Sequence, residues 1–304
     1  MWAQALTNTI IEMKFAYVVL HYKTLDLTID CVRHLSAVSP SSHIVVVDNG
    51  SGDGSGEALQ SLYQSADNIH VIPGRTNLGF AGGNNLGYSY VRDNLGACSV
   101  VVMNNDVMIS QPDFESRIYD FMSANGVDVC GPDILTPDGT HQNPLLPKPF
   151  SSFRIMKQMA IDSARLLCLR LGIFQKRILA TYTSVSSSYH RQDVTPADVH
   201  GCVPHGACLV FSSRYLSEMP YAFEPVTFLY GEEMILSELC RYRGYRIGIC
   251  ASAQVTHLGG KSTMVDVPQR ERQIFKIRMT LRSMWSLLKL RTIKNYVFLR
   301  NNNV

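Results

Sequence analysis

Acidic and amide side chains follow two short apolar segments that have the composition of buried strands. Residues 44–47 are apolar and lead directly into Asp48. Residues 99–103 lead into an Asn-Asn-Asp sequence that ends at Asp106. A carboxylate in such a place can accept hydrogen bonds from a ribose or a base, and it can hold a divalent cation that bridges two phosphates. Asp48 and Asp106 are therefore candidate ligand-binding residues, with an ordinary turn or helix cap as the alternative.

A second group of candidate residues lies in the later part of the chain. Glu232 and Glu233 stand side by side at the head of a predicted helix, where one of them could serve as a general base. A helix dipole also favours acids at this position, and that structural role would account for one of the two. His257 ends a strand-like segment before a Gly-Gly turn, where a histidine is either a ligand or a structural residue.

The elements that must position these residues alternate between strand and helix, which predicts an α/β fold with a mostly parallel, Rossmann-like sheet flanked by helices. In such open sheets, ligands bind beyond the carboxyl ends of the strands, where Asp48 and Asp106 stand. We expect strands at 15–21, 44–47, 70–73 and 99–103, helices at 28–35, from 57 and at 88–94, and a Gly/Asn-rich loop at 75–87.

The chain changes character after residue 130. We expect a strand at 203–211 and a strand, a turn and a second strand over 245–257. A helical insertion over 145–195 has one apolar and one basic side, and a basic helical tail follows over 264–304. The main domain is expected to span 14–263, and we assign no role to the leader at 1–13, which lacks the features of a signal peptide.

Composition limits the classes of function. The 304 residues are 46% hydrophobic and 17% charged, as in a globular chain, and the net charge of +3 argues against a general nucleic-acid partner. No apolar run approaches the ~20 residues that span a bilayer. The eight scattered cysteines fit a reducing cytoplasm. Four residues within nine positions leave a zinc site open as an alternative, namely His200, Cys202, His205 and Cys208.

The order of these motifs resembles the inverting family-2 glycosyltransferases of the GT-A fold, and in particular the rhamnosyltransferase-like members of bacterial polysaccharide pathways. The resemblance covers about 15–263. It is most specific in RTNLGFAGGNN at 75–85 and in HGACLVF at 205–211. It implies an enzyme that transfers a hexose from a nucleoside-diphosphate sugar, of the dTDP-rhamnose or UDP-hexose type, to a hydroxyl of a glycan or lipid-linked acceptor.

The resemblance also implies roles for individual residues. Glu233, with Glu232 as the alternative, would be the catalytic base, and Asp106 with His257 would hold Mg²⁺ or Mn²⁺. The acceptor side would include His205 and Gly206. The nucleotide sugar would be bound by His21, Tyr22, Asp48, Asn49, Ser51, Asn77, Gly79, Asn84, Asn104, Asn105 and Asp106.

Two positions depart from the family pattern. Asn104 replaces the first acid of an Asp-x-Asp motif, and Ile235 stands where the family often has an Asp two residues after the base. These departures leave a catalytically inactive nucleotide-sugar-binding protein as the alternative. A dinucleotide oxidoreductase is disfavoured because no GxGxxG follows the first strand. A nucleotidyltransferase is disfavoured because the first loop is not Gly-rich and basic.

The basic amphipathic segments at 154–177 and 282–300 suggest contact with an anionic membrane surface, which would suit a lipid-linked acceptor. The alternative is that both segments pack on the domain with their basic sides in water. The expected location is the cytoplasm, peripheral to the inner face of the plasma membrane.

Overall fold

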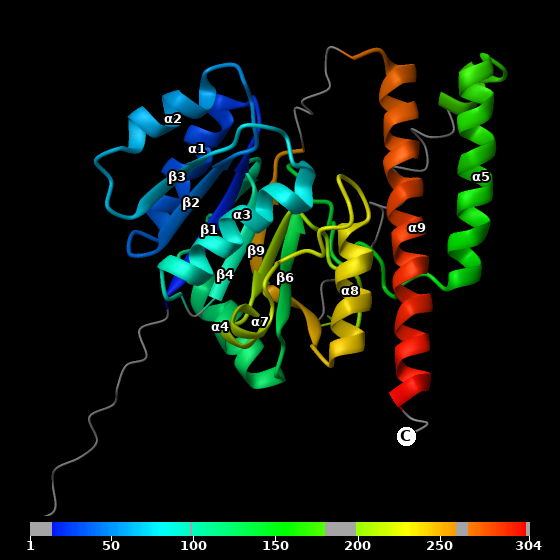
Figure 1. The fold of residues 1–304 in the computed structure, drawn as a ribbon. Coiled ribbons are helices and arrows are strands. Elements are labelled where there is room, and N and C mark those ends of the chain that lie inside the picture. The colour runs from blue at the N-terminus through cyan, green and yellow to red at the C-terminus, as the bar shows by residue number, and fades with distance from the viewer. Residues whose placement is uncertain (1–13, 98, 180–198, 260–266, 302–304) are drawn as a thin grey trace, which may run out of the picture.

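The structure is a computed structural model that describes residues 14–97, 99–179, 199–259 and 267–301. The expected leader at 1–13 and the second part of the expected insertion, at 180–198, lie outside the described residues. Figure 1 shows a twisted sheet with helices on both faces, and a pair of long helices beyond one end of it.

The N-terminal half of the chain builds the parallel part of the sheet. Its strands are rich in valine and isoleucine. Strands β1, β2 and β4 are buried on both faces, as central parallel strands require, whereas the edge strand β3 is only half-buried. The strands are β1 (Phe15–His21), β2 (His43–Asp48), β3 (Ile69–Pro73) and β4 (Ser99–Asn104), and the helices that connect them are α1 (Leu25–Val38), α2 (Ser55–Tyr63) and α3 (Gly79–Asn94).

The second half extends this sheet with mixed pairing. Its elements are β5 (Val107–Met108), α4 (Phe114–Asn125), β6 (Val129–Leu135), α5 (Ser152–Leu171), β7 (Val199–His200), β8 (Cys208–Phe211), α7 (Ser213–Glu218), α8 (Glu232–Arg243), β9 (Ile247–His257) and α9 (Gln269–Asn301). Among the described residues the strand order is β3-β2-β1-β4-β8-β6-β9-β5, with β7 also paired to β9. The α/β class and the GT-A architecture expected from the sequence are confirmed.

The two faces of the sheet carry separate hydrophobic cores. Along β1, Tyr17 and Val19 belong to the core under α1, α2 and α4, whereas Ala16 and Val18 belong to the core under α3, α7 and α8. This assignment follows from the alternation of side chains along a strand.

The direction of the connections reverses at β1. The chain moves outward from β1 to β2 and β3, and then crosses back to place β4 on the other side of β1. The carboxyl ends of β1, β2 and β4 therefore border a topological switch point, which is the usual ligand-binding place in open α/β sheets.

The Gly/Asn-rich segment at 75–87 is largely helical, so the expectation of a loop is wrong for its second part. Helix α3 begins at Gly79. A Cβ atom on Gly87 would lie 2.3 Å from Val18 Cγ1, and one on Gly83 would lie 2.5 Å from Leu20 Cδ1. These glycines let α3 pack directly on β1, and that packing outweighs the ~1 kcal/mol that a glycine costs inside a helix.

Two strand expectations also need correction. Residues 247–257 form one strand without a turn, because a shift of register against β6 between Pro132 and Asp133 absorbs the irregularity. The strand expected at 203–211 is regular only as β8, because Val203 pairs in an isolated bridge with Leu146 instead.

Helices α5 and α9 form a separate layer. They run antiparallel, since Arg270 near the start of α9 donates to the Leu169 carbonyl near the end of α5, and Arg291 donates to Ser152 at its start. A third hydrophobic cluster joins them to α8 through Ile155, Ile235 and Leu287. In Figure 1, α9 stands between α8 and α5. Within the described residues, no helix is long and apolar enough to cross a membrane.

Candidate active site

Strand register brings three of the expected site residues to one edge of the sheet. His21 of β1 pairs with Asp48 of β2, and Leu20 pairs with Asn104 of β4. His21, Asp48 and Asn104 thus end neighbouring parallel strands at the switch point. This is the place that the sequence predicted for ligand binding.

Asp48 is held in one orientation by the turn that follows it. Its Oδ1 accepts hydrogen bonds from the backbone N–H and the hydroxyl of Ser51, at 3.0 and 2.6 Å. Ser51 Oγ also accepts from the backbone N–H of Lys23, at 2.9 Å. A Cβ on Gly56 would lie 2.3 Å from Asp48 Oδ2, so the start of α2 can approach the carboxylate only because residue 56 is glycine.

The side chain of His21 is occupied inside the protein. Its Nδ1 lies 2.8 Å from Thr28 Oγ1 and its Nε2 lies 2.7 Å from Ser55 Oγ. The residue is completely buried, and this burial lowers the pKa of the imidazole. His21 therefore ties β1 to α1 and α2, and its imidazole does not face the open end of the strands. Tyr22 is partly exposed beside it, with Lys23 Nζ 5.3 Å from its ring centre.

A network of amides fixes the loop before α3. Asn49 Nδ2 donates to Asn77 Oδ1 and to the Gly79 carbonyl, at 3.2 and 3.1 Å. Asn49 Oδ1 accepts from the backbone N–H of Leu78, at 2.9 Å. Gly79 has a φ of +75°, and a Cβ there would lie 2.0 Å from the Phe228 carbonyl oxygen. Asn49 is thus a cross-link between the end of β2 and the start of α3.

Asn84 lies on α3, one turn from this loop. Its Nδ2 donates to the Phe80 carbonyl at 3.0 Å, but its buried Oδ1 has no hydrogen-bond partner within the described part of the chain. A buried acceptor without a partner is uncommon and points to a group that completes it.

Asn104 and Asn105 have different surroundings. The backbone N–H of Asn104 donates to the Ala207 carbonyl at 2.9 Å, and its side chain is partly exposed. Asn105 Nδ2 donates to the hydroxyls of Thr24 and Thr28, both at 2.8 Å. Asn105 therefore holds the start of α1 against the end of β4.

Asp106 and His257, the two residues that the resemblance names as metal ligands, lie next to each other. Asp106 Oδ2 lies 3.2 Å from His257 Nε2, and the Asp106 carbonyl accepts from the backbone N–H of Leu258 at 2.9 Å. The other carboxylate oxygen, Oδ1, is buried without a hydrogen-bond partner among the described residues. Gln142 Oε1 lies 2.8 Å from His257 Nδ1 and fixes the orientation of the ring.

This pair fits a divalent cation that completes its shell with ligand oxygens. Asp106 Oδ1 is an unused buried carboxylate oxygen, and magnesium commonly takes one or two carboxylates with water and phosphate. No group of three or more His, Cys, Asp and Glu side chains is arranged for a metal in the part of the chain that the structure describes. The zinc alternative loses two of its four ligands, because Cys202 and Cys208 are buried in different hydrophobic cores.

Two residues of the site were missed from the sequence. Gln142 orients His257, and Asn143 Oδ1 accepts from the backbone N–H of His205 at 2.7 Å. Asn143 Nδ2 also donates to the Pro132 carbonyl at 2.6 Å. The polar sequence His-Gln-Asn-Pro at 141–144 was the available signal, but nothing local indicates that it folds back onto β6.

Glu233 lies beside the HGA segment at 205–207, which includes the two residues expected on the acceptor side. A Cβ on Gly206 would lie 2.6 Å from Glu233 Oε1. Burial raises the pKa of Glu233, and this effect outweighs the backbone groups of Glu233 itself, Gly206 and Gly231, which favour the ionised carboxylate.

Glu232 has a different environment from its neighbour. It is 4% exposed, and its Oε1 has no hydrogen-bond partner within the described residues. Burial, and after it the charge of Glu233, raise its pKa to about 7. Two adjacent carboxyls with raised pKa values are typical of a functional site.

Two histidines connect Asp106 to the acidic pair. The rings of His205 and His257 are 5.7 Å apart at an angle of 61°. His205 is followed by Gly206, which contacts Glu233. The tertiary structure thus connects Asp106, His257, His205 and Glu233 into one site, although they come from four separate segments.

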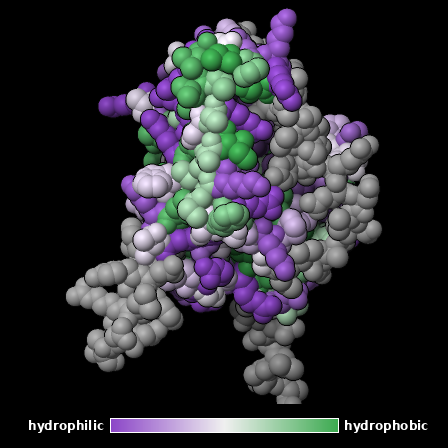
Figure 2. Space-filling view, turned by 90° about the vertical axis from the view of Figure 1, so that its right-hand side faces the viewer, coloured by the Kyte–Doolittle hydropathy of each residue, from purple (hydrophilic) through white to green (hydrophobic). Residues whose placement is uncertain are grey.

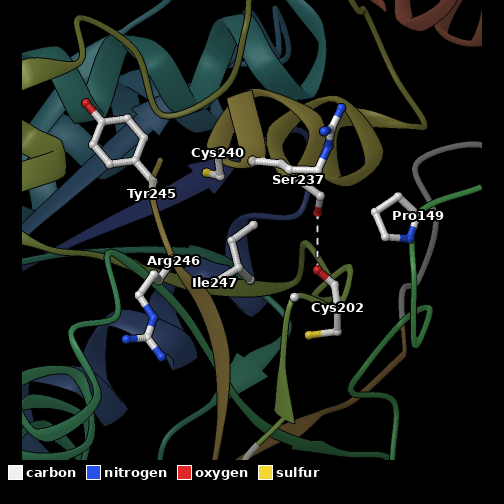
Figure 3. A pocket seen from close by; sticks show the side chains of 9 residues that line it. Pro149, Cys202, Ser237, Cys240, Tyr245, Arg246 and Ile247 are labelled. Atoms are coloured by element: carbon white, nitrogen blue, oxygen red, sulfur yellow. Dashed lines mark hydrogen bonds between the residues drawn. The ribbon is translucent and has the colours of Figure 1, made fainter. Parts of the chain in front are cut away.

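A cavity of about 240 Å³ lies at the far end of β9 from His257 and begins one turn along α8 from Glu233 (Figure 3). It is lined by residues near the amino end of β9, including Arg246 and Ile247, and by Ser237, whose hydroxyl donates to the Cys202 carbonyl at 3.5 Å. His257 is at the other end of β9, roughly 30 Å away at the rise of a strand. The cavity is therefore remote from the Asp106–His257 end of the site.

Comparisons with known proteins address the fold and the family. Among solved structures, the fold matches S. aureus TarS residues 1–349 in complex with UDP-GlcNAc, at 13% identity and a TM-score of 0.51, over 87% of this chain and 66% of that one. It also matches S. aureus TarS at 14% identity and a TM-score of 0.50, over 86% of this chain and 39% of that one. At such identities the matches show the fold alone.

A curated relative is similar in sequence. The low-salt glycan biosynthesis hexosyltransferase Agl10 of Haloferax volcanii is 25% identical over 244 residues, which are 79% of this chain. The chain spans 66% of the length of that relative. The model of the family described as glycosyl transferase family 2 matches residues 17–194, more than half of the chain. The chain is therefore a member of glycosyl transferase family 2.

Proposed function

We propose that this protein is an inverting glycosyltransferase that moves a hexose from a nucleoside-diphosphate sugar to a hydroxyl of a glycan or lipid-linked acceptor. The observation that carries the proposal is the placement of Glu233. Its carboxyl group lies against Gly206, and His205 and His257 connect this position to Asp106 at the strand ends. A general base on one side of the site and a diphosphate-binding edge of the sheet on the other suit a single displacement at the anomeric carbon.

The donor is proposed from the strand-end edge and from the relatives. Asp48, Asn49 and the start of α3 border the place where the base and ribose would lie. TarS has been solved with UDP-GlcNAc, and Agl10 is described as a hexosyltransferase of glycan biosynthesis. We propose a UDP-hexose or dTDP-rhamnose donor and an acceptor in surface-glycan synthesis.

Glu233 would act as the general base. Its pKa is raised by burial, which makes the carboxylate a better proton acceptor, and general-base assistance is typically worth ~10²–10⁴-fold in rate. The acceptor hydroxyl would lose its proton to Glu233 while its oxygen attacks the anomeric carbon. The bond from that carbon to the diphosphate breaks on the opposite face, so the anomeric configuration inverts. Glu232, more deeply buried and with a pKa of about 7, is the alternative base.

The departing diphosphate gains negative charge that the site must stabilise. Asp106 and His257 would hold Mg²⁺ or Mn²⁺, which supplies positive charge at the diphosphate oxygens. Gln142 keeps the His257 ring in place for this task, and Asn143 keeps the backbone at His205 in place beside it.

A titration panel tests the donor site. UDP, dTDP, GDP and NAD are each added with and without Mn²⁺, and thermal unfolding is recorded. A ligand present at about 100 times its dissociation constant adds ~2.7 kcal/mol of stability. We expect a Mn²⁺-dependent rise with UDP or dTDP. A rise with NAD alone contradicts the proposal.

The variant Glu233→Gln tests the base. Nucleoside diphosphate release is measured from the nucleotide sugar whose base bound in the titration. We expect a ~10²–10⁴-fold loss of release with unchanged binding of the nucleoside diphosphate. Full release by Glu233→Gln, with loss in Glu232→Gln, would transfer the role to Glu232. Binding without release in the wild type would indicate a nucleotide-sugar-binding protein.

A further inference from the structure

Helix α5 carries an apolar face that nothing in the described chain covers. The exposed fractions of Phe153 and Leu171 are 74% and 63%, and Phe174, just beyond the helix, is 69% exposed. Figure 2 looks straight at this side of the molecule and shows a band of hydrophobic residues bordered by hydrophilic ones. Monomeric proteins seldom leave such a continuous apolar strip in water unless it binds something.

The exposed residues follow helical periodicity, so they form one face. Ile155, Asp162 and Leu169 recur every seven residues and are buried toward α9. On the opposite side of the helix, exposed residues recur at intervals of three or four positions. We call this side the outer face of α5. It consists of Phe153, Met156, Ala160, Ala164, Leu167 and Leu171. Packing on α9 therefore accounts for the buried side of α5 but not for the apolar outer face.

The charges beside the outer face have one sign. Residues 152–177 include six Lys and Arg residues and a single acid, Asp162. That acid is buried and accepts hydrogen bonds from Arg165 and Gln158, at 3.1 and 3.0 Å. Lys157 and Arg170 are exposed beside the outer face. The outer face of α5 therefore presents apolar side chains between positive charges.

We propose that the outer face of α5 docks on an anionic lipid membrane, with the helix lying in the plane of the interface. A helix with apolar residues between flanking lysines and arginines binds lipid headgroups and acyl chains in this way. Its 20 residues extend about 30 Å along the surface, and no described helix could cross the bilayer. A second copy of the chain is a poorer occupant, because a two-fold contact would bring two sets of positive charges together.

The structure separates the roles of the two segments that resemble membrane-binding helices. Helix α9 lies between α5 and α8, and its Leu287 is buried in the cluster that joins all three. The membrane contact is therefore assigned to α5, with α9 as its support. The outer face of α5 lies on the side of that helix that points away from this cluster.

Vesicle flotation of the full chain tests this assignment. Vesicles of phosphatidylcholine alone are compared with vesicles that also contain phosphatidylglycerol. We expect the wild type to float only with the anionic vesicles. The double variant Leu167→Gln/Leu171→Gln should weaken binding at least about tenfold, because it removes apolar area from the lipid contact. Lys157→Gln and Arg170→Gln should each weaken binding about fivefold.

The matched control is Leu62→Gln on α2, where a leucine is 55% exposed on another part of the surface. It should float as the wild type does, and all variants should keep the unfolding temperature of the wild type because the altered side chains are exposed. Equal flotation of wild type and Leu167→Gln/Leu171→Gln, or no flotation of the wild type, overturns the proposal. A lipid-free dimer that Leu167→Gln/Leu171→Gln makes monomeric would assign the face to a second copy instead. Nucleoside diphosphate binding is measured separately and does not depend on this surface.

Discussion

At the scale of single residues, helix α8 holds three carboxyl groups, two buried and one half-buried, whose pKa values are shifted in opposite directions. Glu232 and Glu233 lie at its start with raised pKa values. Burial alone would also raise the pKa of Glu238, but the hydrogen bonds and charges of Arg241 and Arg291 outweigh it, so the pKa of Glu238 lies below its usual range. One helix thus contains carboxyls that destabilise the fold when ionised and one that stabilises it.

The first prediction concerns Glu232→Gln. Because the folded pKa of about 7 lies above the ordinary value of 4.5, the unfolded chain releases its proton first as the pH rises. Glu232 therefore costs stability increasingly from about pH 4.5 to 7, and the cost is complete above pH 7. We expect Glu232→Gln to be more stable than the wild type at pH 8 by on the order of 1–3 kcal/mol. Urea unfolding at several pH values measures this, and a gain that grows toward acid contradicts it.

Glu238→Gln is the matched control, with the same substitution on the same helix. The lowered pKa means that the stability contributed by Glu238 is present above its unfolded pKa and is lost as the pH falls. Removing one partner of this buried ion pair should cost about 3–5 kcal/mol at neutral pH. The two variants should therefore shift stability in opposite directions, and shifts of the same sign would refute the assignment of their environments.

At the scale of elements, the close approach of α3 to β1 positions the donor side of the site. Gly87 allows the helix to contact Val18 and Val47 directly. The start of the same helix is held by Asn49 and by the Phe228 carbonyl, which accepts from the backbone N–H of Phe80 at 2.7 Å. The position of the loop that borders the nucleotide therefore depends on the packing of the whole helix.

The second prediction is that Gly87→Ala destabilises the fold. The added Cβ would lie 2.3 Å from Val18 Cγ1 and 2.9 Å from Val47 Cγ2, so the helix must move away from the sheet. Overpacking of this kind costs about 1–3 kcal/mol, although alanine favours helices more than glycine does. Leu86→Ala on the exposed side of α3 is the control and should change stability by less than about 0.5 kcal/mol. Chemical unfolding measures the stability of the two variants. If Gly87→Ala is as stable as Leu86→Ala, α3 is not packed tightly against β1.

At the scale of the whole molecule, Ile235 joins the catalytic domain to the α5–α9 layer. Family resemblance leads one to expect an acid at this position. In the structure Ile235 is buried with Ile155 and Leu287, so an apolar residue is required here by packing. The departure from the family pattern thus has a structural reason that is independent of the proposed base.

The third prediction is that Ile235→Asp, which restores the residue common in the family, severely destabilises this protein. A carboxylate would be placed among apolar side chains of three helices, at a cost of about 3 kcal/mol or more. Ile235→Val keeps the apolar contact and should cost only about 0.5–1.5 kcal/mol. Thermal unfolding compares them, and a stable Ile235→Asp variant with higher transfer activity would show that the layer is loosely attached.

Much of the parallel half of the sheet could be predicted from local sequence. Strands β1, β2 and β4 are apolar runs that end in polar residues, and that pattern is visible without the fold. The glycines of α3 misled the prediction because helix propensity is a local quantity, whereas the space they leave for β1 is not. The prediction also divided β9 into two strands. It did so for a similar reason, because the shift of register against β6 that keeps β9 continuous is not visible in the local sequence.

The sequence by itself determined the family, the α/β class and the identity of the polar residues that end the strands, because those features depend on short-range order along the chain. Only the tertiary structure decided which of these residues meet. It brought Asp106 to His257, placed Gly206 against Glu233, and revealed Gln142 and Asn143 as their supports. It also buried His21 and left one side of α5 in water. Such outcomes depend on the packing of segments far apart in the chain, which no local pattern contains.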